Sequence, residues 1–295
     1  MKKIRLKAYG KLNLGLDVIG KRNDGYHELS MVMQTVKLYD TIELHALDMP
    51  LPGTDGIRLS CDKKGLSTDE NNIVYKAIKL MKQEFNIKDP VDAVLTKHIP
   101  VAAGMAGGSA DAAATLIAMN YLFSLKASKE KLCELGLLLG ADVPFCVMRG
   151  TMLCEGIGEK MTRLPEPPYC HILIAKPMKG ISTKEIYEAA DSLPDPYHPD
   201  IKAIIKALTD KDLAALAKNC GNTLEAVTAA RLPVIQRIEE IMLSNGALTA
   251  VMTGSGPTVF GLFTDRNAAR LAGKKIRNKA AGEAMDQVSL TEWFK

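Results

Sequence analysis

Polar and apolar side chains alternate with a period of two residues from Lys3 to Val18. Charged, tyrosine and asparagine side chains would occupy one face and alanine, leucine and valine side chains the other, which predicts a half-buried strand or hairpin. Lys11 and Asn13 are two residues apart, so both would point to the same side, roughly 6.6 Å from each other along the strand. Together they could bind one ligand, although most such pairs belong to a solvated sheet face.

A turn signal, Asn-Asp-Gly at residues 23–25, separates two β-prone runs between residues 20 and 47. Tyr26 and His27 follow this turn directly. Aromatic rings beside a turn often cover only the edge of a core, so their position leaves both a structural and a binding role open.

Residues 48–69 are rich in Pro, Gly, Asp and Ser, and this composition predicts a loop with one short strand over 57–60. Helical spacing of apolar residues then predicts a helix over 70–85, which Asp69 or Asn71 could cap. Alternation predicts a strand over 91–97. This strand leads directly into a glycine-rich segment.

The glycine-rich segment, residues 100–120, reads PVAAGMAGGSADAAATLIAMN and runs straight into an alanine-rich helix. Turn glycines let backbone N–H groups converge on one point, and the following helix aims its partial positive end at the same point. The order of strand, glycine-rich turn and helix is therefore the order that phosphate-binding loops require. The alternative is a turn that only reverses the chain before a packed helix.

The segment differs from two common phosphate motifs. After two consecutive glycines the chain continues with Ser109 and lacks the lysine of a Walker A loop, and the strict G-x-G-x-x-G of a dinucleotide site is missing. A lysine from elsewhere must then neutralise a phosphate, with Lys97 and Lys11 as candidates. Asp111 suits the helix dipole but would repel a phosphate, so we expect it to turn away or to meet a metal ion.

Helical spacing returns over 128–139, and a strand is expected to start near Phe145. Between them, Asp142 is flanked by alanine and valine in an apolar neighbourhood. A carboxylate in such surroundings usually caps a helix or pairs with a lysine. The functional alternative is a general base whose pKa the surroundings tune.

A turn-rich stretch at 156–168 predicts a boundary between a first domain over 1–158 and a second over 159–295. The second domain is predicted to hold strands over 170–175, 249–252, 258–263 and 285–290, and helices over 183–190, 199–217, 233–244 and 267–279. Without the extra helices the order is β-α-β-β-α-β, which is ferredoxin-like. The T-G-S-G-P hairpin at 253–257 joins the middle strands, either as a simple turn or as a second anion nest.

The amino-acid composition restricts the binding partners and the cellular compartment that we expect for this protein. The 295 residues carry a net charge of only +4, and aromatic residues make up 5%, which argues against a nucleic-acid partner. The six cysteines form no C-x-x-C pair and the five histidines lack metal-ligand spacing, so free thiols in a reducing compartment are expected. The sequence shows no signal-peptide run and no stretch of about 18 apolar residues, which predicts a cytoplasmic protein without a membrane partner.

Three motifs in this order resemble those of the GHMP kinases, the family of galactokinase and of homoserine, mevalonate and phosphomevalonate kinases. They are the N-terminal lysine strand, the P-x3-G-x-x-G-G-S segment that opens a helix, and the late T-G-S-G-P hairpin. The resemblance spans essentially the whole chain. It implies a two-domain α+β fold, with an N-terminal β/α domain that contains a left-handed βαβ unit and a C-terminal ferredoxin-like βαββαβ domain. The left hand is an exception to the usual right-handed rule.

Further strings narrow the resemblance, namely AYGKLNLGLDVIGKRNDGYHEL (8–29), GADVPF (140–145) and STKEIY (182–187). They resemble the branch of the family that phosphorylates the 2-hydroxyl of a cytidine-diphosphate-linked methylerythritol in the non-mevalonate isoprenoid pathway. This implies a small-molecule substrate, with ATP as phosphate donor and Mg2+ as its metal. Metal ligands and oligomeric state do not follow from the resemblance.

The resemblance also implies roles for individual residues. Asp142 would take the proton from the substrate hydroxyl, while Lys11 would orient that hydroxyl and stabilise developing charge. Tyr26 and Tyr187 would sandwich the cytosine ring, and His27 would read its hydrogen-bonding edge. The other implied substrate-binding residues are Asn13, Thr183, Gly254, Ser255 and Gly256. The residues implied around ATP are Asn72, Lys97, Pro100, Gly104, Met105, Ala106, Gly107, Gly108, Ser109 and Ala110.

The sequence departs from the family pattern in the glycine-rich segment. Ala110 follows Ser109 where many relatives have a second serine, so one hydroxyl that would contact phosphate or Mg2+ is absent. Met105-Ala106 stands where Leu-Gly is common. Two alternative functions remain open. A homoserine or mevalonate kinase of the same family would have no base for the aromatic residues to hold, and an RNA-binding α/β module would need denser basic and aromatic clusters.

Overall fold

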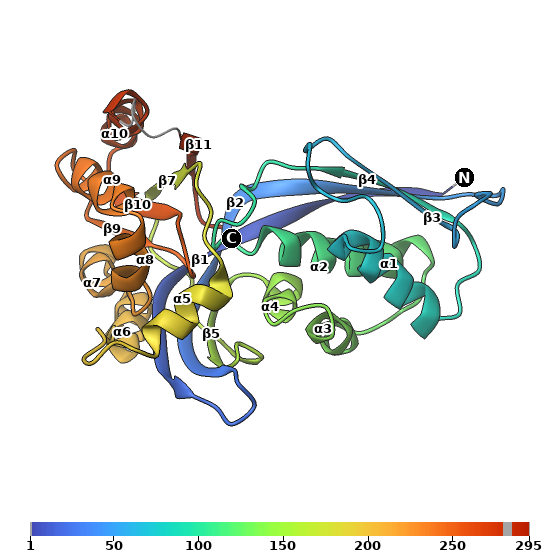
Figure 1. Ribbon diagram of the computed structural model, residues 1–295, viewed down its shortest axis with the longest axis horizontal. Helices are drawn as coiled ribbons and strands as arrows, with labels where there is room; N and C mark the ends of the chain where they lie inside the picture. The colour runs from blue at the N-terminus through green and yellow to red at the C-terminus, as the bar shows by residue number, and fades with distance from the viewer. Residues whose placement is uncertain (1, 280–284, 295) are drawn as a thin grey trace. The chain divides into compact units, whose positions relative to one another are not determined.

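The computed structural model describes residues 2–279 and 285–294 (Figure 1). The strands are β1 (Lys3–Lys21), β2 (His27–Ala46), β3 (Ile57–Cys61), β4 (Val91–Thr96), β5 (Thr151–Gly156), β6 (Lys160–Arg163), β7 (His171–Pro177), β8 (Gly221–Asn222), β9 (Thr249–Met252), β10 (Val259–Phe263) and β11 (Met285–Thr291). The helices are α1 (Ile73–Glu84), α2 (Gly107–Leu122), α3 (Lys129–Leu137), α4 (Val143–Met148), α5 (Thr183–Ala190), α6 (Ile201–Asp210), α7 (Leu213–Asn219), α8 (Glu225–Arg231), α9 (Val234–Leu243) and α10 (Arg266–Lys279).

Two compact units alternate along the chain. Unit 1 comprises residues 1–10, 38–99 and 106–149, and unit 2 comprises residues 11–37, 100–105 and 150–295. The long strands β1 and β2 are each divided between the two units, because a unit boundary falls within each strand. Neither unit is a single run of the chain, so the two units do not test the expected division at residue 158. That division stays a prediction.

In unit 1 the sheet runs in the order β3-β4-β2-β1, with β4 antiparallel to β2 and parallel to β3. The chain passes from β3 to β4 through α1, as a parallel pair of strands requires. Alternate residues of β4 are buried, because one face of the strand packs on helices. Figure 1 shows α1 and α2 along one face of these strands, and α1 turns its apolar stripe inward.

Two predictions of local structure in unit 1 are wrong. The strand expected near Phe145 is the helix α4, because Pro144 lies in its first turn, where the missing N–H and the fixed φ of proline favour a helix start. The cap of α1 is Asn72, whose side chain accepts a hydrogen bond from the first turn, rather than Asp69 or Asn71.

In unit 2 the strands β11, β7, β10 and β9 form an antiparallel sheet in that order. In chain order these are the fourth, first, third and second strands of a ferredoxin-like arrangement, and α9 and α10 pack against the sheet. The predicted β-α-β-β-α-β order is therefore confirmed for the residues that the structure describes.

The remaining elements of unit 2 differ from the prediction. The single helix expected over 199–217 is two helices, α6 and α7, which are separated at Lys211, a residue with a left-handed backbone at φ 56°. β8 was not predicted, because two residues cannot show a periodic pattern. It pairs in parallel with β1 at Gly15 and Leu16. Also in unit 2, β5 is antiparallel to both β2 and β6.

Candidate active site

Lys11 and Asn13 are neighbours on one face of β1, and both are buried. The exposed fraction is 4% for Lys11 and 0% for Asn13, so a solvated sheet face is the wrong description of this pair. Lys11 Nζ donates to Asn13 Oδ1 at 2.6 Å, and the Lys11 amide donates to the Met105 carbonyl at 3.1 Å. Because a buried ammonium needs polar partners, the asparagine orients the lysine.

Thr253, in the T-G-S-G-P hairpin, holds Asn13 in place. Its Oγ1 accepts a hydrogen bond from the Asn13 amide at 2.9 Å and donates to Asn13 Oδ1 at 3.4 Å. Asn13 Nδ2 donates to Met31 Sδ at 3.4 Å. These bonds join the lysine strand to the hairpin, two motifs that lie far apart in the sequence. Thr253 belongs to a predicted motif but had no predicted role.

The glycine-rich segment and the hairpin also meet within unit 2. Gly104 and Gly254 both have left-handed backbones, with φ of 70° and 59°. A Cβ on Gly104 would lie 2.2 Å from the Thr253 carbonyl oxygen, and a Cβ on Gly254 would lie 2.7 Å from the Gly104 carbonyl oxygen. Both positions therefore require glycine. The Gly256 amide closes the hairpin with a hydrogen bond to the Thr253 carbonyl at 3.0 Å.

Two side chains from other elements fix the hairpin. Asn222 Nδ2 donates to the carbonyls of Met252 and Gly254, both at 2.8 Å. Thr183 Oγ1 forms a hydrogen bond with Ser255 Oγ at 2.8 Å, so two predicted substrate-binding residues are in contact. Asn222 was not predicted, because the two-residue strand β8 gives no sequence signal of its own.

In unit 1, α2 begins without a capping side chain. Ala106 stands at the N-cap position with φ 54°, and a methyl group cannot accept a hydrogen bond from the first turn. Exposed N–H groups at such a helix end attract anions. A Cβ on Gly107 would lie 3.4 Å from Lys97 Nζ, and a Cβ on Gly140 would lie 4.0 Å from Ser109 Oγ, so an ammonium and a hydroxyl lie near this helix end. Of the other predicted ATP-binding residues in this segment, Pro100, Met105 and Ala110 are buried and Gly108 is exposed.

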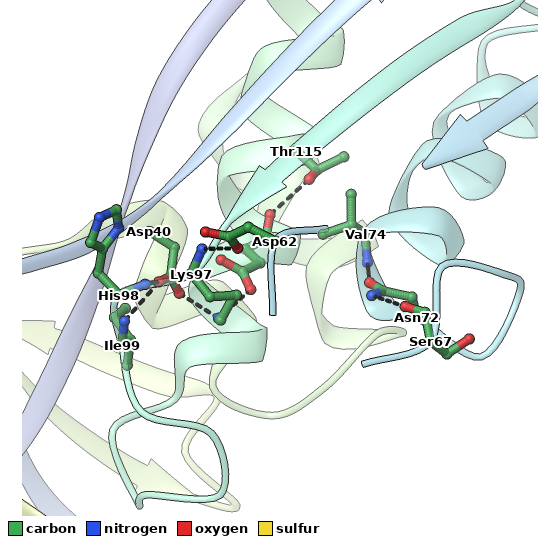
Figure 2. Close-up of polar contacts among 10 residues, drawn as sticks. Asp40, Asp62, Ser67, Asn72, Val74, Lys97, His98, Ile99 and Thr115 are labelled. Carbon is green, nitrogen blue, oxygen red and sulfur yellow. Dashed lines mark hydrogen bonds and ion pairs between the residues drawn. The ribbon is translucent and has the colours of Figure 1, made fainter. Parts of the chain in front are cut away.

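Lys97 forms an ion-pair cluster with Asp40 and Asp111, and Figure 2 shows its contact with Asp40. Its Nζ contacts Asp40 Oδ2 and lies 2.7 Å from Asp111 Oδ2. Asp40 Oδ1 also accepts hydrogen bonds from the amides of His98 and Ile99. Among the described residues, the buried Asp111 Oδ1 has no hydrogen-bond partner. Asp111 therefore meets a lysine, a partner that neither expectation, turning away or meeting a metal ion, included.

The two carboxylates of this cluster share one ammonium. Burial raises the pKa of Asp111 to about 8, with Lys97 opposing this shift and Asp40 adding to it. Burial also works to lower the pKa of Lys97, but the carboxylates of Asp111 and Asp40 outweigh it and raise that pKa. Three donors face the Asp40 carboxylate and one faces that of Asp111, so a proton taken up by the cluster goes to Asp111.

Asn72 and Asp142 stand at the starts of α1 and α4. Asn72 Oδ1 accepts from the Val74 amide at 2.9 Å, and its Nδ2 donates to the Ser67 carbonyl at 2.6 Å (Figure 2). These bonds occupy both polar atoms of a side chain that the resemblance places near the adenosine. Asp142 occupies the N-cap position of α4, but its side chain does not cap that helix. The capping alternative is therefore wrong, while the pairing with a lysine and the role of general base both stay predictions.

His27 and Tyr187, from β2 and α5, pack against each other with ring centroids 4.8 Å apart and a tilt of 31°. His27 Nε2 lies 2.6 Å from Asp191 Oδ1, and Lys21 Nζ lies 2.7 Å from Asp191 Oδ2. Tyr26 is 60% exposed, which leaves its ring accessible to a ligand. Asp191 had no predicted role, since no local pattern connects it to His27.

Three further findings concern the residues that the structure describes. No group of three or more His, Cys, Asp or Glu side chains is arranged to hold a metal ion there. Within the same residues, every helix is too short or too polar to cross a bilayer. The six cysteines are free thiols.

Comparison with known proteins connects these motifs to one family. The family model described as GHMP kinases N terminal domain matches residues 72–150, and the one described as GHMP kinases C terminal matches residues 201–282. A relative from Lachnospira eligens, named 4-diphosphocytidyl-2-C-methyl-D-erythritol kinase, is 51% identical over 294 residues, which cover 100% of this chain and 99% of the relative.

Solved structures resemble the fold over nearly its whole length. A crystal structure of 4-(cytidine 5'-diphospho)-2C-methyl-D-erythritol kinase is 27% identical with a TM-score of 0.80, and the match covers 99% of this chain and 100% of that chain. Homoserine kinase from Cytophaga hutchinsonii is 20% identical with a TM-score of 0.76, covering 99% and 95%. The second likeness concerns the fold alone. The two-domain α+β fold that the sequence predicted is confirmed.

Proposed function

The chain belongs to the GHMP kinases, and we propose that it transfers the γ-phosphoryl group of ATP to the 2-hydroxyl of 4-diphosphocytidyl-2-C-methyl-D-erythritol. The observation that carries this proposal is the 51% identity to a relative of that name, with 100% of this chain and 99% of the relative aligned. The products are the 2-phosphate and ADP. The reaction is a step of the non-mevalonate isoprenoid pathway.

Lys11 and Asp142 carry the chemical step in this proposal. Asp142 accepts the proton of the 2-hydroxyl, and Lys11 orients the hydroxyl and stabilises the charge that develops during transfer. The hydrogen bond from Lys11 to Asn13 supports this role, because it holds the ammonium in one orientation. Phosphoryl transfer mainly demands positioning and charge stabilisation, so a base, a lysine and an N–H cradle form a sufficient set.

The glycine-rich segment around α2 binds the phosphates of ATP in this proposal. The uncapped N-terminus of α2 supports the assignment, because its N–H groups and partial positive charge favour an anion. Magnesium arrives with the nucleotide, as the Mg-ATP substrate. Lys97 is already engaged by Asp40 and Asp111, so neutralisation of the phosphates falls mainly to this magnesium ion.

Tyr26 and Tyr187 hold the cytosine ring of the acceptor in this proposal, and His27 lies beside it. The exposure of Tyr26 and the packing of His27 against Tyr187 support a site for a single base. Homoserine and mevalonate have no base for such a site to hold. The cytidyl acceptor is therefore better supported than either alternative, and an RNA-binding role has no support from the family.

A panel of acceptors in a coupled assay of ADP release tests the proposal. The purified protein receives Mg-ATP with the cytidyl substrate, homoserine or mevalonate in parallel. We expect ADP release above background with the cytidyl substrate alone, and a new phosphomonoester signal in the phosphorus NMR spectrum of its product. Release with mevalonate or homoserine instead would overturn the substrate assignment, and release with none of the three would overturn the reaction.

We also propose that the protein works in the cytoplasm on small molecules, without a nucleic-acid or membrane partner. Its free thiols support a reducing compartment. Localisation of a tagged full-length chain by fractionation checks this proposal.

A further inference from the structure

The carboxylate of Asp191 joins both ends of the turn between β1 and β2. Its Oδ1 lies 2.6 Å from His27 Nε2, and its Oδ2 lies 2.7 Å from Lys21 Nζ. Lys21 is the last residue of β1 and His27 is the first of β2. The exposed fraction of the side chains falls from 54% for Lys21 to 26% for Asp191 and 9% for His27. The histidine is thus the sheltered end of the cluster.

Asp191 is also attached to the helix that carries Tyr187. It is the C-cap residue of α5, and its amide donates a hydrogen bond to the Tyr187 carbonyl at 3.1 Å. The ring of Tyr187 in turn packs against the ring of His27. Asp191, His27 and Tyr187 therefore form a closed set of contacts, in which displacement of one residue displaces the other two.

The stability of α5 does not explain an aspartate at this position. A negative charge at a helix C-terminus interacts unfavourably with the helix dipole. In α5, all of which the structure describes, Ile186 is the one fully buried residue, so the helix has little core packing. It depends on polar contacts at its ends, where Thr183 meets Ser255 and Asp191 meets His27.

We propose that Asp191 is a positioning residue that determines specificity in the cytidyl substrate site, because it fixes the ring of His27, which in turn holds Tyr187 as one wall of that site. The inference rests on the proposed function, since it concerns the base that this function places there. An ionised carboxylate accepts from Nε2–H, so of the two tautomers of a histidine ring Asp191 favours the one that carries its hydrogen on Nε2 and leaves Nδ1 as an acceptor. Hydrogen bonds from Lys21 and His27 lower the pKa of Asp191, which keeps it ionised near neutral pH.

The test compares Asp191→Asn with a matched control, Asp210→Asn. An asparagine offers one acceptor oxygen and cannot bind His27 and Lys21 together as a carboxylate does. Asp210 is the control because it makes an exposed pair with Lys206 at 2.5 Å, one turn along α6. For each protein we would measure kcat, the KM of the cytidyl substrate and of ATP, the Kd of CDP by calorimetry, and the nitrogen-15 chemical shifts of the histidine rings.

We expect Asp191→Asn to raise the KM of the cytidyl substrate and the Kd of CDP about tenfold, the effect of one lost charge-assisted contact. Its kcat and its KM for ATP should stay close to those of the wild type. The nitrogen shifts should show that His27 has lost its single Nε2–H form. Asp210→Asn should match the wild type throughout. An unchanged KM, Kd and His27 spectrum in folded Asp191→Asn would overturn the inference.

The wild-type spectrum keeps the inference testable if Asp191→Asn does not fold. His27 should show the single Nε2–H form that the contact with Asp191 requires; a His27 ring that exchanges between both tautomers would overturn the inference. A wild type without activity on the cytidyl substrate refutes the proposed function. An active wild type together with an unaffected Asp191→Asn refutes only the role of Asp191.

Discussion

The cluster of Asp40, Lys97 and Asp111 leads to opposite predictions for two substitutions of the same size. Asp40→Asn removes an anion that faces one ammonium and two backbone amides, and it leaves Lys97 buried. Removing one partner of a buried ion pair typically lowers the free energy of unfolding by about 3–5 kcal/mol. We expect a loss of this size for Asp40→Asn near pH 7.

Asp111→Asn should instead stabilise the protein. The pKa of Asp111 is raised by burial from 3.8 to about 8. Between these values the folded protein binds a proton that the unfolded chain does not, so this group lowers the free energy of unfolding by about 1.4 kcal/mol for each unit of rising pH. Its favourable contribution is present in full below about pH 4 and is lost as the pH rises through about 8. An asparagine carries no such proton. The free energy of unfolding of Asp111→Asn relative to that of the wild type should therefore rise between about pH 4 and pH 8, and the difference should stay constant above about pH 8.

Urea unfolding between pH 5 and pH 9, followed by far-ultraviolet circular dichroism, measures both effects. The free energy of unfolding is compared at a common denaturant slope, and Asp111→Asn should exceed the wild type by about 1 kcal/mol or more at pH 7. Equal destabilisation by Asp40→Asn and Asp111→Asn would refute the reasoning. So would a difference between Asp111→Asn and the wild type that does not change with pH.

Three further predictions concern the proposed site. Gly104→Ala should lower the free energy of unfolding by about 3 kcal/mol, because its Cβ would lie 2.2 Å from a backbone oxygen and its backbone is left-handed. Gly180→Ala, whose new Cβ would lie 3.7 Å from the Ala102 side chain, is the control and should be nearly neutral in the same urea titration. Asp142→Asn should lower kcat by about a hundredfold or more with the Kd of CDP unchanged; near-normal turnover would remove Asp142 from the role of base. Tyr26→Ala should raise the KM of the cytidyl substrate about tenfold to a hundredfold through lost stacking, and an unchanged KM would contradict its place at the base.

The sequence predicted best those elements whose side chains alternate between core and solvent. β4 is a strand over Val91–Thr96 and α1 a helix over Ile73–Glu84, both close to their expected bounds, because burial of one face imposes the period that the sequence shows. The ferredoxin-like order of strands and helices could be predicted for the same reason. The glycine-rich turn before α2 could be predicted because a turn and the helix that follows it are local features of the sequence.

Contacts between distant segments could not be predicted in this way. Lys97 meets Asp40 across 57 residues and His27 meets Asp191 across 164, and no local pattern says which distant carboxylate a cation will meet. The helix α4 was mistaken for a strand because its short apolar run fits either element. The roles of Lys11 and Asp142 came from resemblance to a family and stay predictions until their variants are assayed.

The approach of Gly104 to Gly254 affects how sequences of relatives can be interpreted. At each of these glycines, backbone atoms of the other segment occupy the space that a side chain would need. A substitution at one glycine therefore cannot be compensated by a substitution at the other. Covariation reveals contacts through paired substitutions, and a contact between two backbones allows none. Covariation across homologues would therefore not detect the contact between the glycine-rich segment and the hairpin at these two glycines. The contact is found from the backbone geometry instead.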